Sequence, residues 1–183
     1  AANAGVVIQL PLPEQIEVQS ILNSVVPEKD VDVLAARSVG NVQVGKSKVL
    51  PPVAGAVELL LEKYHIAIKG KRAVVLGYGR LVGQPVAALL LAHGAQVTVL
   101  GDEGLYDAEL LRSADIVVSG IGKPNFIYGD DVKEGATVID VGTSESDGVI
   151  VGDVDFESVS KKAAFMTPRR GGVGPLTVAL ILH

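Results

Sequence analysis

The stretch from Lys71 to Gly83, K-R-A-V-V-L-G-Y-G-R-L-V-G, decides the fold. Its first part, Arg72 to Leu76, is a short valine-rich run that predicts a buried strand. Glycines follow at once, and Pro85 to His93 then predicts a helix rich in alanine and leucine. Glycines between a strand and a helix let the backbone approach an anion, and the amides at the helix start point toward it. The stretch therefore predicts a pyrophosphate site, with a turn that serves only packing as the alternative.

Five residues of this turn are the candidate contacts to a dinucleotide: Gly77, Tyr78, Gly79, Arg80 and Gly83. The side chain of Arg80 has two readings. It is either a solvated residue at the helix start or a bidentate phosphate contact.

The composition is that of a globular α/β protein. The chain has 183 residues, of which 48% are hydrophobic, and it contains no tryptophan and no cysteine. A core made mostly of Val, Leu, Ile and Ala suits parallel strands that are buried on both faces. Acidic and basic residues are interspersed at a net charge of −5, which argues against a nucleic-acid partner. We see no run of membrane-span length and no signal peptide, so we expect a cytoplasmic protein without a membrane partner.

Strand and helix patterns alternate after residue 71. The predicted strands are 72–76, 96–100, 115–119, 136–141 and 163–166, and the short helices between them are 107–112 and 155–162. This alternation predicts an α/β fold with a Rossmann-like, doubly wound parallel sheet. Ligands of such sheets bind at the carboxyl ends of the strands, where Gly77, Asp102, Gly120 and Gly142 fall.

The first fifty residues predict a smaller lobe. Residues 5–10 resemble a strand and residues 14–25 a helix, whereas 33–50 are poorly periodic and predict irregular structure. A helix over 53–64 links this lobe to the nucleotide domain. We therefore divide the chain into a partial N-terminal lobe (1–52), a Rossmann-like NAD(P)-binding domain (53–170), and a closing loop with a C-terminal helix that returns toward the first lobe (171–183).

Four motifs carry a resemblance to a known family. They are Q-L-P-L-P at Gln9, P-E-K-D-V-D at Pro27, V-G-D-V-D-F at Val151 and G-G-V-G-P-L-T at Gly171. In this order they resemble the bifunctional methylenetetrahydrofolate dehydrogenase/methenyltetrahydrofolate cyclohydrolase family, over essentially the whole chain. The resemblance implies a two-lobe enzyme of tetrahydrofolate one-carbon metabolism. An enzyme of this family is expected to oxidise methylenetetrahydrofolate with NAD or NADP and to hydrolyse the product to formyltetrahydrofolate. The resemblance also implies a homodimer and a folate bound between the lobes, residues 1–52 being the remainder of the smaller α/β folate (catalytic) lobe.

The resemblance assigns folate-site roles residue by residue. Gln9 resembles the glutamine that assists the family's catalytic lysine, although from the residues alone it reads as a solvent-facing glutamine at a strand end. Asp32 resembles the catalytic-site aspartate that anchors the pterin ring, although its turn also reads as a solvated loop. Pro11 resembles a residue of the folate cleft, and Gly172 and Pro175 lie in the closing loop.

The resemblance also assigns cofactor contacts. Gly77, Tyr78 and Gly79 stand where the family has G-R-S, and Thr143 stands where it makes a backbone contact. Asp102 stands in place of a serine near the ribose phosphate. An acidic residue there takes the ribose hydroxyls of NAD and repels a 2′-phosphate, so we predict NAD over NADP.

The chain departs from the family at several positions. It contains no Y-x-x-x-K pattern, so we expect a partial chain without the family's catalytic lysine and with little cyclohydrolase activity of its own. A non-catalytic dinucleotide-binding module therefore stays open as a second hypothesis. Arg169 and Arg170 replace part of the family's P-V-P-G-G near the expected ligands. None of the three histidines has a partner acid or nucleophile beside it, and we expect no metal site.

Overall fold

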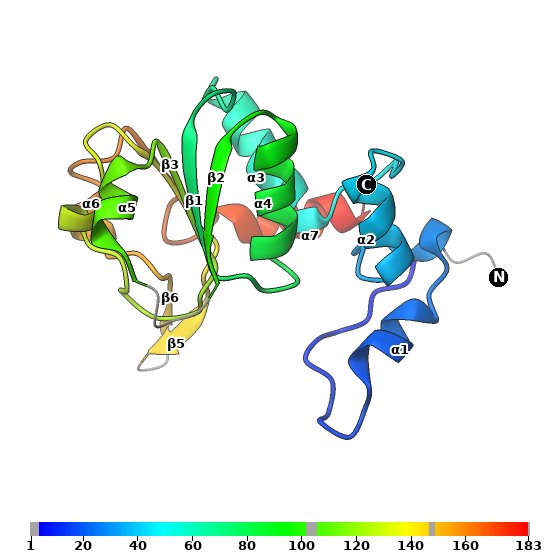
Figure 1. The fold of residues 1–183 in the computed structure, drawn as a ribbon. Coiled ribbons are helices and arrows are strands. Elements are labelled where there is room, and N and C mark those ends of the chain that lie inside the picture. Colours follow the sequence, from blue (N-terminus) through cyan, green and yellow to red (C-terminus); the bar gives the residue numbers. More distant parts are fainter. Residues whose placement is uncertain (1–3, 102–105, 147–148, 183) are drawn as a thin grey trace.

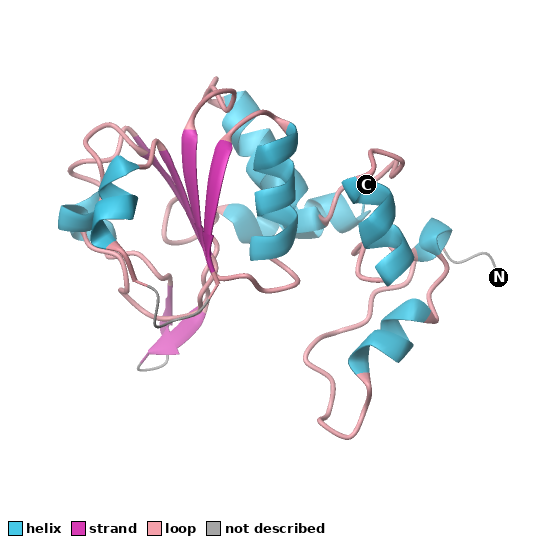
Figure 2. Ribbon diagram, viewed as in Figure 1, coloured by secondary structure: helices cyan, strands magenta, loops and turns pink. Residues whose placement is uncertain are grey.

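The computed structural model describes residues 4–101, 106–146 and 149–182. One layer of five parallel strands lies between two layers of helices, and a small separate lobe stands to one side (Figures 1 and 2). The strands of this sheet are β1 (Arg72–Leu76), β2 (Gln96–Leu100), β3 (Ile116–Ser119), β4 (Thr137–Asp140) and β7 (Phe165–Met166). The predicted doubly wound α/β fold is therefore confirmed.

Helices cover both faces of the sheet because each central strand is apolar on both sides. Along β1, Ala73 and Val75 belong to one apolar cluster, whereas Val74 and Leu76 belong to the other. The first cluster is closed by α3 (Pro52–Lys63), α4 (Gly83–Ala92) and α7 (Val173–Leu182). The second is closed by α5 (Ala108–Ser113), α6 (Phe156–Val159) and the 3₁₀ turn η2 (Gly129–Asp131).

The strand order β2-β1-β3-β4-β7 places a change of direction beside β1. The chain leaves β1 for β2 on one side, returns through α5, and enters β3 on the other side. Such a reversal opens a crevice at the carboxyl ends of the two strands. The turn after β1 and the loop after β3 therefore lie next to each other at this edge.

The first lobe contains α1 (Val18–Asn23), the 3₁₀ turn η1 (Pro27–Lys29) and α2 (Ala36–Gln43). Figure 1 shows this lobe set apart from the sheet, with α7 extending toward it. Two expectations were wrong here. Residues 5–10 form no strand, because in the described chain only Asp30 pairs with them, through one isolated bridge to Val6. Residues 33–50 are not all irregular, since α2 occupies the middle of them.

Hydrogen-bond acceptors from other parts of the chain stabilise the start of α2, which the sequence did not predict. Asn23 of α1 accepts the amide of Ala36 at 2.9 Å, and Asp30 accepts those of Leu34 and Ala35 at 3.1 and 2.8 Å. Amides at a helix start need such acceptors, and here tertiary contacts provide them. The short hairpin of β5 (Ser144–Ser146) and β6 (Val149–Val151) was not predicted either.

None of the described helices combines the length and the apolar character that a membrane crossing requires. Within the same residues, no group of three or more His, Asp or Glu side chains is placed to hold a metal ion.

Candidate functional site

The turn after β1 is built so closely that only glycine fits at its base. A Cβ atom at Gly83 would lie 1.9 Å from the carbonyl oxygen of Gly77. Gly77 has a φ of +90°, and a Cβ there would lie 2.9 Å from the carbonyl oxygen of Gly120. The start of α4, the turn after β1 and the loop after β3 therefore touch through bare backbone.

This arrangement leaves the amides of the turn unused. In the described part of the chain, no residue from Tyr78 to Val82 donates its amide to a backbone carbonyl. A cavity of about 210 Å³ opens beside the turn. It is lined by Gly77, Tyr78, Gly79, Leu100, Gly101, Gly120 and Ile121. Unpaired amides at a helix start, with glycines that admit a close approach, fit the pyrophosphate of a dinucleotide.

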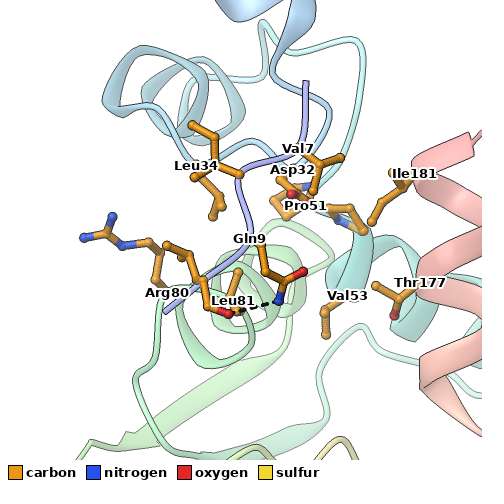
Figure 3. Close-up of a pocket in the computed structure, with 13 residues that line it drawn as sticks. Val7, Gln9, Asp32, Leu34, Pro51, Val53, Arg80, Leu81, Thr177 and Ile181 are labelled. Atoms are coloured by element: carbon orange, nitrogen blue, oxygen red, sulfur yellow. Dashed lines mark hydrogen bonds between the residues drawn. The ribbon is translucent and has the colours of Figure 1, made fainter. Parts of the chain in front are cut away.

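A second cavity, of about 210 Å³, lies between the two lobes (Figure 3). Gln9 and Asp32 of the first lobe line it together with Leu81 of the turn, and α7 adds Thr177 and Ile181. Most of the other lining is apolar, from Val7, Ile8, Leu10, Leu34, Pro51, Pro52 and Val53. The structure therefore brings together two of the predicted folate-site residues, and it adds Thr177 and Ile181 of α7, which the sequence analysis did not name.

The two aspartates of the P-E-K-D-V-D turn have different tasks. Asp30 is 5% exposed and both of its carboxylate oxygens accept backbone amides, so it holds the turn in shape. Asp32 lines the cavity between the lobes. Burial, and secondarily the charge of Asp30, raises the pKa of Asp32 above its usual value. A carboxylate held in this way gains from a ligand that donates hydrogen bonds to it.

A third cavity, of about 570 Å³, joins the other two in space. It is lined by Pro11 and Leu12 of the first lobe together with Gly79, Arg80 and Gly120 of the nucleotide side, and by Leu10, Val18, Leu81 and Val82. It shares Gly79 and Gly120 with the cavity at the turn, and Leu10, Arg80 and Leu81 with the cavity between the lobes. The three cavities therefore adjoin one another in a row from the glycine turn to Asp32, and together they are called the cleft below.

Arg80 lies where the cavities meet, and its side chain keeps one nitrogen unsatisfied. Within the described residues, Nη1 of Arg80 is buried without a hydrogen-bond partner. The guanidinium points away from Gln9 and Asp32 (Figure 3). An unpaired buried guanidinium nitrogen at the end of a pyrophosphate turn is suited to an anion.

Thr143 lies in a different cavity, of about 620 Å³, beyond the ends of β4 and β7. Arg169 and Arg170 also line it. Arg169 is paired with Glu157 at 3.1 Å and lies over the ring of Phe156, so it belongs to the α6 side of the sheet. The structure thus places Thr143 and both arginines outside the cleft between the glycine turn and Asp32.

Asp140, which lines the Thr143 cavity, is a half-buried carboxylate with a raised pKa. Burial raises the pKa of Asp140 to about 6, although the amides of Asp153 and Val154 oppose the shift. A group whose pKa is higher in the folded state binds more protons in the native than in the unfolded protein, at any pH between the two pKa values. Stability from this group is therefore greatest at low pH and declines as the pH rises through that window.

We expect Asp140→Asn to remove this dependence. Between roughly pH 4 and pH 6, the unfolding free energy of the wild type should fall relative to that of Asp140→Asn by up to about 3 kcal/mol. Urea unfolding of both proteins across this range measures the difference, in which the titration of groups that do not interact with Asp140 cancels. Parallel pH profiles would show that Asp140 titrates normally.

The remaining predicted residues fall into three groups. Gly83 lies behind the turn and lines none of these cavities, so it permits the turn rather than facing a ligand. Gly172 and Pro175 are at the start of α7 and line none of them either, whereas Thr177 and Ile181 of the same helix do. Thr177 closes the G-G-V-G-P-L-T motif, and Ile181 lies one turn further along the same face. Asp102 lies outside the described residues.

Comparisons with known proteins agree with this geometry. Residues 51–183 match the family described as tetrahydrofolate dehydrogenase/cyclohydrolase, NAD(P)-binding domain. The chain is 46% identical over 179 residues to the bifunctional protein FolD of Lactobacillus acidophilus, and the match covers 98% of this chain and 63% of that protein.

Solved structures resemble the chain equally well. The bifunctional enzyme FolD-methylenetetrahydrofolate dehydrogenase/cyclohydrolase of Campylobacter jejuni superimposes with a TM-score of 0.94 at 42% identity, over 98% of this chain and 64% of that one. The N5,N10-methylenetetrahydrofolate dehydrogenase-cyclohydrolase of Trypanosoma brucei, solved with NADP and an inhibitor, gives a TM-score of 0.90 at 41% identity, over 98% of this chain and 64% of that one.

Proposed function

Because the chain belongs to the tetrahydrofolate dehydrogenase/cyclohydrolase family, we propose that it serves in two reactions on tetrahydrofolate derivatives. The first oxidises methylenetetrahydrofolate to methenyltetrahydrofolate by transferring a hydride to a nicotinamide dinucleotide. The second adds water to the methenyl carbon and yields formyltetrahydrofolate. The observation that carries the proposal is the row of adjoining cavities from the glycine turn to Asp32, along which two ligands would meet end to end.

Each part of the cleft has a task in this chemistry. The amides after Gly77 and the side chain of Arg80 hold the phosphates of the dinucleotide. When bound, the dinucleotide supplies the hydride acceptor. Asp32 accepts parallel N–H bonds from the pterin, and this fixes the reacting carbon in position. Gln9, across the same cavity, is the polar group that orients a proton-transferring side chain.

The chain divides into three parts, each of which contributes to the cleft or its closure. We assign residues 1–52 to the folate lobe, 53–170 to the NAD(P)-binding domain, and 171–183 to the closing loop and returning helix. Two observations support this division. Neither apolar cluster of the sheet contains a residue before α3, and Thr177 and Ile181 of α7 reach back to the first lobe. We also propose that the protein forms a homodimer and acts in the cytoplasm. Analytical ultracentrifugation of the purified protein tests the oligomeric state.

The proposal is tested by titrating the chain with NAD, NADP and tetrahydrofolate, and by following dinucleotide reduction with methylenetetrahydrofolate. We expect binding of a dinucleotide and of folate. Reduction that depends on the folate supports the dehydrogenase. Dinucleotide binding without reduction or folate binding supports the non-catalytic module instead, and absence of all binding overturns both. The chain contains no Y-x-x-x-K pattern, so little hydrolysis of methenyltetrahydrofolate is expected from it alone.

We further propose that NAD is preferred to NADP. Asp102 follows Gly77 by 25 residues, near the roughly 20-residue distance at which an acidic residue meets the ribose hydroxyls of NAD. Its charge opposes a 2′-phosphate. NADP is the competing cofactor, since the T. brucei relative was solved with it and Arg80 offers a cation.

The preference predicts the behaviour of Asp102→Ser. The wild type should bind NAD at least about tenfold more tightly than NADP. The substitution should improve NADP binding by a similar factor, which corresponds to about 1.4 kcal/mol of binding free energy. Calorimetric titration of both cofactors into both proteins gives the ratio. The preference is refuted if NADP binds the wild type more tightly and Asp102→Ser leaves NADP binding unchanged.

A further inference from the structure

The V-G-D-V-D-F motif contains a carboxylate that lines none of the three cavities of the cleft. Asp153 is completely buried, yet its carboxylate is fully used. It accepts the hydroxyl of Ser119 at 2.7 Å, the amide of Ile121 at 2.8 Å and the amide of Lys123 at 2.9 Å. These three donors lie at the end of β3 and in the loop that follows it, about thirty residues away along the chain.

The loop that Asp153 holds is one wall of the candidate dinucleotide site. Ile121 and its neighbour Gly120 both line the cavity beside the glycine turn. The carbonyl oxygen of Gly120 is also the atom that a Cβ at Gly77 would meet at 2.9 Å. Since Gly120 and Ile121 form part of the cavity wall, a movement of the Ile121 amide changes the shape of the cavity.

A second carboxylate fixes Asp153 in turn. Asp140, at the end of β4, accepts the amides of Asp153 at 3.1 Å and Val154 at 3.0 Å, and that of Gly142 at 3.0 Å. Glycines make room for both carboxylates. A Cβ at Gly142 would lie 2.1 Å from the carboxylate of Asp153, and one at Gly152 would lie 2.0 Å from that of Asp140. The ends of β3 and β4 are therefore joined through two carboxylates rather than through apolar packing.

We propose that Asp153 is a positioning residue for the dinucleotide site, acting through the amides of Ile121 and Lys123, and that Asp140 holds Asp153 in place. This inference rests on the proposed function, because it assigns the site a dinucleotide. The chemistry favours a carboxylate at this position. Three donors converge on one side chain, and only a group with two acceptor oxygens and no donor satisfies all of them.

The test compares Asp153→Asn with Asp107→Ala. Asparagine keeps the size of the side chain, but it replaces one carboxylate oxygen by an NH₂ group, which cannot accept a hydrogen bond from the hydroxyl and amide donors around it. Asp107 caps α5 by accepting the amide of Leu110 at 3.0 Å, so its loss lowers stability without touching the loop. We expect Asp153→Asn to raise the dissociation constant of the preferred dinucleotide by about tenfold or more, the change that one lost charge-assisted hydrogen bond produces. Asp107→Ala should change it by less than about twofold while lowering the melting temperature, as a lost cap does.

Hydrogen exchange supplies the readout at the loop itself. The amides of Ile121 and Lys123 should exchange faster in Asp153→Asn and at the wild-type rate in Asp107→Ala. Should Asp153→Asn fail to fold, Ser119→Ala removes only the hydroxyl bond, and it should weaken dinucleotide binding and speed exchange at Ile121 to a smaller degree.

The outcomes separate this inference from the proposed function. A wild type that binds no dinucleotide overturns both. A wild type that binds, with Asp153→Asn binding as tightly or Ser119→Ala indistinguishable from wild type in affinity and exchange, overturns the positioning role alone.

Discussion

Gly83→Ala is expected to lower the free energy of unfolding by about 3 kcal/mol or more, at the upper end of what overpacking costs. The added methyl group would lie 1.9 Å from the carbonyl oxygen of Gly77 and 2.7 Å from its carbonyl carbon. Both atoms are backbone, so no side chain can rotate away. The turn and the first residue of α4 must separate, and dinucleotide binding should be lost together with stability.

Gly79→Ala is the matched control, because it makes the same substitution in the same turn. No atom lies within 4 Å of a Cβ at Gly79. Its unfolding free energy should stay within about 0.5 kcal/mol of the wild-type value, as for an unstrained surface change. Urea unfolding of the three proteins decides the matter. Equal stability of the two variants would mean that the close approach of α4 to the turn is not what holds this site together.

Asp32→Ala is expected to weaken tetrahydrofolate binding by about 2 to 5 kcal/mol, the range for removing one partner of a buried charged pair. It should leave the melting temperature unchanged or slightly raised. The physical reason is that Asp32 is poorly solvated and lies near the charge of Asp30, both of which raise its pKa. In the unliganded protein its charge is therefore a cost, which only a hydrogen-bonding ligand offsets.

Asp30→Ala is the counterpart in the same turn. Removing Asp30 leaves the buried amides of Leu34 and Ala35 without an acceptor, so the melting temperature should fall clearly. Calorimetric titration with tetrahydrofolate and thermal unfolding of both variants give the comparison. A fall in melting temperature for Asp32→Ala with unchanged folate affinity would make Asp32 a structural residue of the turn and remove the folate site from it.

Burial and hydrogen bonding, rather than residue type, thus distinguish the two aspartates. The carboxylate of Asp30 accepts backbone amides, whereas Asp32 lines the cavity between the lobes. The same distinction applies to Asp153 and Asp140. Their acidic side chains stand at strand ends, where a ligand contact is a natural reading, yet their oxygens accept protein donors.

The local chemistry of the sequence by itself determined the sheet and the turn. Residues 72–76 and 96–100 form strands with the predicted bounds, and 116–119 and 137–140 lie within the predicted ones. Short valine-rich runs that end at a glycine favour strands over helices, so neighbours in the chain suffice to recognise them. The glycine turn between β1 and α4 is recognisable for the same reason, because strand, turn and helix are contiguous.

Only the tertiary structure decided what depends on partners distant in the chain. Residues 5–10 have a strand-like pattern but lack a neighbouring strand among the described residues. Helix α2 contains Gly40 and two valines, which are poor helix formers, but it receives acceptors from Asn23 and Asp30. Asp153 reaches donors about thirty positions earlier in the chain. A hydrogen bond satisfies a buried group regardless of sequence distance, so such pairs leave no periodic trace in the sequence, and folding alone brings them together.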